Sequence, residues 1–325
     1  MPRLHVALLA LLALITNALA VAAPPPLPPP LDALWHRDVV LAEATLSAVE
    51  PPRRLRFVDV DVRHGGEARA EVAVEVDDAV LAQVRPGTRY VLAWIEWMRS
   101  PANKKQRVKR SGGPLLVSTP GASPALFEAT ADWRELLLAP PSPERLETRA
   151  HLDRALAGLD DEDPRVQSLF AAELALRGAL QQRLTAEDRQ RLREAAARGT
   201  GAPAARTALL EAARIHAAAF GDGWTAVAAG LIAREPVAHT SGAANEGLVW
   251  AAFALLSEQA GEASLPALGR WVASGNGALA EQALLAVRRQ APQREAALVA
   301  AALDDPALAP GTRAFLRDHQ RRMPR

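Results

Sequence analysis

The chain has 325 residues, of which 49% are hydrophobic and 23% are charged. At about 150 residues per domain, this length fits two domains, and the ordinary composition excludes a largely disordered protein. Cysteine is absent, which excludes disulfides, thiolate metal sites and cysteine nucleophiles. The 38 basic and 37 acidic residues leave a net charge of +1, so no overall field attracts nucleic acid or anionic membranes.

Residues 1–22 have the layout of an export signal. Arg3 precedes an apolar run at 6–15, and an A-x-A cleavage site follows at Ala18 and Ala20. The alternative is an uncleaved anchor, because the whole apolar stretch just reaches the length that crosses a bilayer. We therefore expect an exported, periplasmic protein, with a form anchored in the inner membrane as the alternative.

Residues 23–34 are rich in proline, with two runs of three prolines on either side of Leu27. Fixed φ angles and missing N–H donors favour polyproline II over a packed element. We predict a stiff spacer between the export signal and the first domain.

Residues 35–139 are predicted to form a small β domain with five strands. Five segments are rich in β-branched and aromatic residues, and Gly, Pro or Asp separates several of them: 39–49, 55–63, 67–76, 89–97 and 114–118. The third segment alternates apolar and charged residues, as a strand with one exposed face does. The fourth is apolar on both faces, which indicates a central strand.

The second and third segments predict a hairpin with an irregular register. Phe57 and Val58 both occupy apolar positions, so we expect a β-bulge there. With a three-residue turn at 64–66, the register would place Asp61 opposite Arg69, which is a favourable charge pair.

A long bent hairpin followed by a G-x-x-Y-V-L strand, here Gly87 to Leu92, resembles the netrin-type, tissue-inhibitor-like variety of the OB barrel. The resemblance implies a closed five-stranded barrel that binds proteins or glycans, and it transfers no catalytic residue to this chain. The chain departs from the disulfide-bearing members of that group because it has no cysteine.

A strongly basic segment joins the fourth and fifth predicted strands. It carries six positive charges and no acid: Arg99, Lys104, Lys105, Arg107, Lys109 and Arg110. The corresponding loop of an OB barrel faces ligands, so these residues are a candidate site for lipopolysaccharide, an acidic cell-wall polymer or an acidic protein patch. The alternative is a solvated hairpin tip. The loop lacks the aromatic residues of single-stranded nucleic-acid binders, and we expect no nucleic-acid partner.

Residues 142–325 are predicted to form stacked helix pairs. First helices recur at residues 166, 205, 245, 279 and 312, and second helices lie between them at 186–198, 224–234, 265–273 and 293–303. A repeated two-helix unit with this period is typical of an α-solenoid, here with about five helix pairs.

The entry to the first repeat resembles the HEAT-repeat pattern, in which an acidic residue and a proline precede the first helix. Asp163 is predicted to cap the helix and Pro164 to occupy its first turn, ahead of Val166 and the Ala171-Ala172 pair. The expected architecture is therefore multidomain β + α, with a small OB-like barrel followed by a HEAT-like solenoid.

Two charged residues interrupt the apolar stripe of the first predicted helix. Glu173 and Arg177 are four residues apart, so they can pair along the helix. On the first helix of the next repeat, His216 falls in the apolar stripe as well. If the helices stack, these three side chains form a polar cluster, either as a buried ion pair with a core histidine or as a candidate active site.

Known catalytic motifs are missing from the sequence, including G-x-S-x-G, H-E-x-x-H, the P-loop and G-x-G-x-x-G. The histidines lack metal-ligand spacing, so we expect no metal and no cofactor. We expect a non-enzymatic binding or scaffold protein of the bacterial cell envelope, whose partner is a protein or an anionic envelope polymer. The alternative is a periplasmic enzyme with a polar site between the β domain and the helical array.

Overall fold

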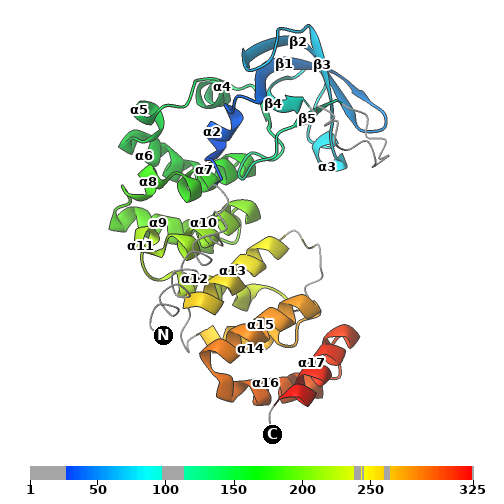
Figure 1. The fold of residues 1–325 in the computed structure, drawn as a ribbon, viewed down its shortest axis with the longest axis vertical. Coiled ribbons are helices and arrows are strands. Elements are labelled where there is room, and N and C mark those ends of the chain that lie inside the picture. Colours follow the sequence, from blue (N-terminus) through cyan, green and yellow to red (C-terminus); the bar gives the residue numbers. More distant parts are fainter. Residues whose placement is uncertain (1–26, 97–112, 238–242, 244, 260–263, 324–325) are drawn as a thin grey trace, which may run out of the picture.

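The computed structural model describes residues 27–96, 113–237, 243, 245–259 and 264–323. A β barrel lies at one end of an elongated array of helices, which runs to the C-terminus at the other end (Figure 1). The predicted export signal lies outside the described residues. Within the described part of the chain, no helix has the length and apolar character needed to cross a membrane.

Five strands close into the predicted OB-like barrel. Strand β1 pairs with both β2 and β4, β2 pairs with β3, β3 pairs in parallel with β5, and β5 pairs with β4. Strand β6 adds to β4. The bounds are β1 (Val39–Glu50), β2 (Arg54–His64), β3 (Glu71–Glu75), β4 (Arg89–Glu96), β5 (Pro114–Leu116) and β6 (Leu126–Glu128), with helix α3 (Asp78–Leu81) between β3 and β4.

The predicted β-bulge is present in β2, at Asp59 and Val60 rather than at Phe57. The pairing of β1 with β2 shifts there by one residue, so both of these residues lie opposite Ala44. Asp59 has a φ of 51°, in the left-handed region. Because one extra residue reverses the alternation of a strand, the odd-numbered Phe57 and the even-numbered Val60 and Val62 all pack on the barrel core.

The predicted pairing of Asp61 with Arg69 is wrong. Strand β3 pairs with β2 one residue away from the expected register, and it begins only at Glu71. Arg69 instead forms an ion pair with Glu96 at 2.8 Å. The turn is wider than expected because Gly65, with a φ of 60°, folds back so closely on β1 that a Cβ would lie 2.1 Å from the Val39 oxygen.

Strand β4 is buried on both faces, as the sequence predicts. Leu92 and Trp94 fill the barrel, whereas the intervening Val91 and Ala93 belong to a second core. Strand β1 divides its residues in the same way. The second core continues through the helices as far as Leu316. The barrel and the helical array therefore share one hydrophobic core.

The helices form two layers, as a solenoid of helix pairs does. Helices α7, α10, α13, α15 and α17 pack in succession in one layer, and α6, α9, α12 and α14 in the other (Figure 1). Their bounds are α4 (Ala131–Leu137), α5 (Pro143–Leu146), α6 (Arg149–Gly158), α7 (Pro164–Leu176), α8 (Gly178–Gln181), α9 (Ala186–Ala197), α10 (Pro203–Ile215), α11 (Ala217–Phe220), α12 (Trp224–Arg234), α13 (Glu246–Gln259), α14 (Leu265–Trp271), α15 (Gly277–Gln290), α16 (Pro292–Asp304) and α17 (Pro310–Arg322).

The repeat entry folds as predicted. Asp163 caps α7 by accepting a hydrogen bond from the Arg165 N–H at 2.8 Å, and Pro164 is the first helical residue. The cap satisfies an N–H group that has no partner within the helix. The start of the first repeat is therefore specified locally.

A recurrent arginine ties successive second helices together. It stands at the end of α9, α12 and α14, at intervals of 36 residues: Arg198, Arg234 and Arg270. Arg198 pairs with Asp160 after α6 at 2.6 Å. The other two donate to main-chain carbonyls at the ends of α9 and α12. A cation is favourable at a helix C-terminus, where carbonyl groups lack partners within the helix.

Residues 30–34, which the sequence assigns to the spacer, instead form helix α2 (Pro30–Leu34). This helix packs against α7, with Leu31 and Leu34 buried in the shared core. The Trp35 indole N–H donates to the Leu137 carbonyl at 2.8 Å. The spacer prediction is wrong for these residues because Pro30 suits a first helical turn and the two leucines, three residues apart, supply an apolar face.

The loop before β6 contacts α7 through a glycine. Gly121 has a φ of 76°, and a Cβ built there would lie 2.6 Å from both the Ala172 Cβ and the Ser168 oxygen. Gly87, two residues before β4, has a φ of 84° but nothing within 4 Å of its Cβ position. The two glycines share a backbone conformation and differ in their surroundings.

We expect Gly121→Ala to destabilise the protein more than Gly87→Ala. Each substitution lowers the free energy of unfolding by about 1–2 kcal/mol because alanine must adopt a left-handed backbone conformation. Gly121→Ala lowers it by about 1–3 kcal/mol more because α7 must shift. Equilibrium urea unfolding measures the difference. Equal losses would show that the barrel loop does not press on α7.

Asp188 connects α6 to α9. It completes a capping box with Thr185 and accepts two hydrogen bonds from Arg149, at 2.6 and 2.9 Å. The Arg149 guanidinium is the main cause that lowers the pKa of Asp188 to about 2, against the opposing effect of burial. Asp188 therefore favours the folded state in its ionised form.

We expect Asp188→Asn to reduce stability at pH 7 but not at pH 2. The folded pKa of about 2 lies below the ordinary 3.8, so the stabilisation is complete above about pH 4 and disappears as the pH falls through 2. The loss at pH 7 is at most about 2 kcal/mol, since Arg149 is half exposed and solvent screens the pair. Urea unfolding between about pH 2 and pH 7 measures this loss of stability, with Asp222→Asn as the exposed control. A difference that is independent of pH would contradict it.

Candidate functional site

Glu173 and Arg177 form an ion pair in the interior of the protein. Glu173 is 0% exposed and Arg177 is 6% exposed. The Arg177 Nε donates to Glu173 Oε2 at 2.7 Å. Helix α7 ends between the two residues, at Leu176. Their pairing therefore stabilises the last turn of the first helix of the array.

The other partners of this pair come from α2 and α6. The Leu31 N–H donates to Glu173 Oε1 at 2.9 Å, and Asp32 forms an ion pair with Arg177. His151 Nε2 lies 3.8 Å from Glu173 Oε2, and no hydrogen-bond partner of this buried nitrogen is found in the described part of the chain. The cluster therefore joins three helices at the start of the array.

His216 does not reach this pair. It follows the last residue of α10, its side chain is exposed, and it forms no hydrogen bond or ion pair with Glu173 or Arg177. The prediction assumed that α10 continues through residue 216, whereas the helix ends at Ile215 and His216 has a φ of −116° and a ψ of 44°. The structure does not form the predicted three-residue cluster.

Burial and charge act in opposite directions on Glu173. Burial favours the neutral carboxyl, but the neighbouring His151 imidazole, the Arg177 guanidinium and the Leu31 N–H hold the pKa of Glu173 below its usual value. The carboxylate is therefore ionised at neutral pH. Because it is inaccessible to solvent and fully engaged, its geometry suits the docking of α2 better than proton transfer to a substrate.

The six basic residues of the candidate binding site, Arg99, Lys104, Lys105, Arg107, Lys109 and Arg110, lie outside the described residues. The flanks of this segment are described. Glu96 at the end of β4 pairs with Pro114 at the start of β5. The segment therefore leaves and re-enters the barrel at neighbouring points, as the loop between the fourth and fifth strands of an OB barrel does.

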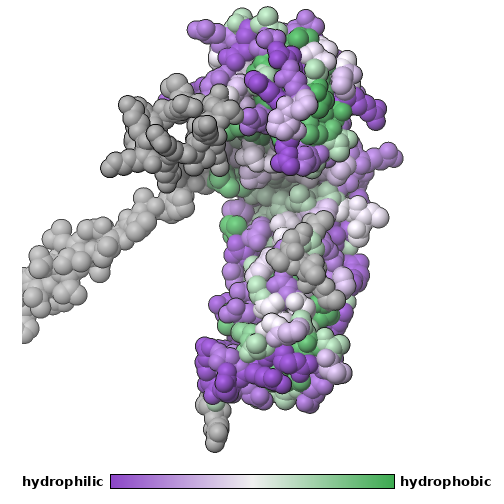
Figure 2. All heavy atoms as spheres, turned by 90° about the vertical axis from the view of Figure 1, so that its right-hand side faces the viewer, coloured by the Kyte–Doolittle hydropathy of each residue, from purple (hydrophilic) through white to green (hydrophobic). Residues whose placement is uncertain are grey.

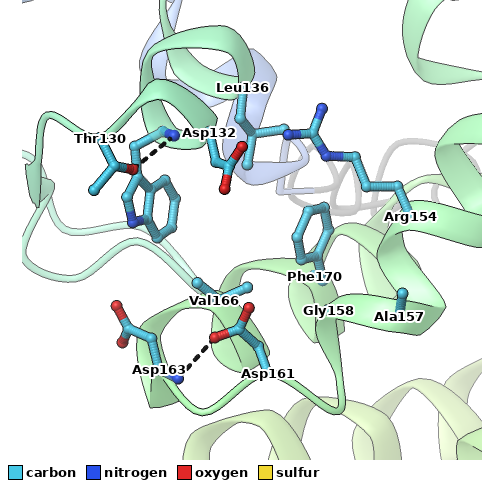
Figure 3. Close-up of a pocket in the computed structure, with 11 residues that line it drawn as sticks. Thr130, Asp132, Leu136, Arg154, Ala157, Gly158, Asp161, Asp163, Val166 and Phe170 are labelled. Carbon is cyan, nitrogen blue, oxygen red and sulfur yellow. Dashed lines mark hydrogen bonds between the residues drawn. The ribbon is translucent and has the colours of Figure 1, made fainter.

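A cavity of about 490 Å³ lies among α4, α6 and the start of α7 (Figure 3). Its volume is within the range of small-molecule sites. Helix α4 follows β6 after two residues, so the cavity is next to the junction of barrel and array. Its lining combines aromatic, aliphatic and charged residues: Thr130, Asp132, Trp133, Leu136, Arg154, Ala157, Gly158, Asp161, Asp163, Val166 and Phe170.

Sequence reasoning missed this cavity. It interpreted Asp163 of the acidic run before α7 as a helix cap, and it did not predict α4. The available signal was the run of four acidic residues at 160–163, which is longer than a helix cap needs. Within the described residues, no group of three or more His, Asp or Glu side chains is arranged to hold a metal ion.

Comparison with protein-family models, with curated proteins and with solved structures yields no match. The function is therefore inferred from the sequence and from the geometry.

We expect Arg177→Met to destabilise the protein more than the double variant Glu173→Leu/Arg177→Met. The single change leaves a buried carboxylate without its main partner, which costs about 3–5 kcal/mol, whereas the double change removes both charges from the interior. Urea unfolding of the wild type, both single variants and the double variant measures this. A double variant that loses the sum of the two single losses would show that the two charges do not interact.

Proposed function

We propose that the protein is a non-enzymatic binding or scaffold protein of the bacterial cell envelope, whose partner is a protein or an anionic envelope polymer. The shared core of the barrel and the array is the main support. Because β1 and β4 are covered on their outer faces by the helical part, the two modules form one continuous frame. Stacked helix pairs offer long side surfaces, which repeat proteins use to bind partners.

The described surface favours a polar or charged partner. Its exposed large hydrophobic side chains are scattered over different elements rather than gathered: Leu27, Val49, Leu115, Ile215 and Leu285. On the face shown in Figure 2, hydrophilic and hydrophobic residues are interspersed, and hydrophobic groups appear at the barrel end as well as along the array. An interface of this kind depends mainly on charge and hydrogen bonding.

We place the anionic part of the partner at the basic segment between β4 and β5. Its six cationic side chains occur with no acid among them, and the paired strand ends hold the two flanks together. A dense group of arginines and lysines binds carboxylate and phosphate groups. The missing aromatic residues disfavour nucleic acid.

We also propose the finer family assignments, with the array of the HEAT type and the barrel of the netrin type. The acidic cap and proline at the start of α7 support the first assignment, as does the arginine that recurs every 36 residues. The G-x-x-Y-V-L strand and the bulged hairpin before it support the second.

Export by residues 1–22 is part of the proposal, and an uncleaved anchor is its alternative. An anchor would leave only residues 24–29 between the bilayer and α2, a span of roughly 20 Å in polyproline II. Since α2 packs on α7, the first repeat would then be held close to the membrane. A cleaved signal would leave the frame free in the periplasm.

The enzyme alternative now has a different candidate location. It cannot use the Glu173, Arg177 and His216 cluster, which is not formed, and it would need the cavity among α4, α6 and α7, which lies near the predicted position between the two modules.

We expect the variant K104Q/K105Q/K109Q/R110Q to bind immobilised lipopolysaccharide or an acidic cell-wall polymer roughly tenfold more weakly than the wild type, since each exposed pair contributes about 0.2–1 kcal/mol. The matched control removes the same charge from four exposed arginines of the array: R183Q/R289Q/R294Q/R317Q.

The control variant is expected to bind like the wild type, and binding is expected to weaken as salt is raised. Photo-crosslinking from a residue of the segment in intact envelopes identifies the partner as a polymer or a protein. Equal losses in the two variants would contradict a specific role of the segment, because they would reflect total charge alone.

A further inference from the structure

We propose that the cavity among α4, α6 and α7 binds an organic cation, namely an ammonium or guanidinium group carried on an apolar stem. This site is additional to the proposed function, because its ligand has the opposite charge to the partner of the basic segment. Its walls, its charges and its size support the proposal.

About half of the cavity wall is apolar. Trp133 of α4 and Phe170 of α7 contribute aromatic rings, and Leu136 and Val166 contribute aliphatic surface. The backbone at Gly158 makes room for one ring, since a Cβ there would lie 2.1 Å from the Phe170 Cδ2. Aromatic rings attract cations through their negative faces, and apolar walls bind a hydrocarbon stem.

The charges that line the cavity are mainly negative. Arg154 is neutralised by Glu135, at 2.8 Å. Asp163 is occupied as the cap of α7. The carboxylates that remain are Asp132, for which no hydrogen bond or ion pair is found among the described residues, and Asp161, which accepts the Asp163 N–H at 2.8 Å.

These two carboxylates face the same space. In Figure 3, Asp132 points into the cavity from the side of α4, and Asp161 points into it from the loop before α7. A ligand between them would meet negative charge on two sides. Two carboxylates placed in this way attract a cation and repel phosphate or carboxylate groups.

The size of the cavity distinguishes an organic cation from a metal ion. The aspartates of this cavity are not arranged to hold a metal ion within the described residues. A volume of about 490 Å³ accommodates a ligand of several carbon atoms. The ammonium or guanidinium group would lie between Asp132 and Asp161, with its stem along the rings.

Two sources supply this chemistry, a free amine and a lysine or arginine side chain of a peptide. Isothermal titration calorimetry on the full mature chain distinguishes them with four probes: agmatine, 1,5-diaminopentane, a blocked tripeptide with a central arginine, and 1,5-pentanediol as the neutral analogue. We expect at least one cation to bind with a Kd on the order of 0.1–1 mM, and the diol not to bind.

Three variants test the location. Asp132→Asn/Asp161→Asn is expected to weaken binding roughly tenfold or more, and Ala157→Trp is expected to abolish it, because Ala157 is an exposed residue on the cavity wall. Asp222→Asn, an exposed aspartate before α12, is the matched control and is expected to bind like the wild type. Thermal unfolding confirms that each variant is folded.

Tighter binding of the tripeptide than of the amines would assign the site to a side chain of a partner protein, and the reverse would assign it to a free amine. The proposal is overturned if no cation binds at millimolar concentration, if the diol binds as well as the amines, or if the double variant and Asp222→Asn bind equally. None of these outcomes depends on the basic segment, so they are separate from the test of the proposed function.

Discussion

Burial of β1 and β4 on both faces is the constraint on which the rest of the structure depends. A closed barrel covers only the inner face of its strands, so Val91 and Ala93 need a second partner on the outside. Strand β6 and the helical part supply it, through Phe127, Trp133 and the helices that follow. The place where the array begins is therefore determined by the two strands that carry apolar residues on both faces, and the junction cavity lies beside this contact.

Charged groups fix the orientation of this apolar contact. Glu43 of β1 is nearly buried and accepts hydrogen bonds from Arg89 of β4 and Arg134 of α4. The Arg134 guanidinium is the main reason why the pKa of Glu43 is lowered despite burial. Apolar surfaces pack in many orientations, but a buried carboxylate is satisfied in only a few.

The cluster of Glu173, Arg177, Asp32 and His151 acts in the same way at the first repeat of the array, where it fixes α2 and α6 on α7. Both clusters lie at the start of the array, and each joins elements from different parts of the chain. If the interface held only apolar groups, α2 could slide along α7 with little change in buried area. The hydrogen bond from Leu31 and the ion pair of Asp32 remove that freedom.

The sequence predicted the parts of the fold that are specified locally. The helix pairs follow from a period of 33–40 residues, and the cap at Asp163 follows from its neighbours. The hairpin register was wrong by one residue because it depends on how the turn at Gly65 folds back on β1, a contact with a strand that is distant in sequence. The place of His216 was wrong because the helical wheel does not show where α10 ends.

The candidate sites were predictable to different degrees, for the same reason. The spacing of Glu173 and Arg177 indicates their pairing, but Asp32 and His151 come from other helices and have no sequence signal. The cavity needs α4, α6 and α7 to meet, so only the tertiary structure shows that Asp132 and Asp161 face one space. The basic segment could be predicted from the sequence alone, because its six positive charges lie close together along the chain.

The near-zero net charge of the chain therefore conceals two local concentrations of charge. A positive segment joins β4 to β5, and a negative cavity lies at the base of α7. Screening limits the reach of each group to about 10 Å at moderate ionic strength, so a ligand responds to the charges near its own site and not to their sum. For a protein whose basic and acidic residues nearly balance, the distribution of charge over the fold determines which partners bind, and the total does not.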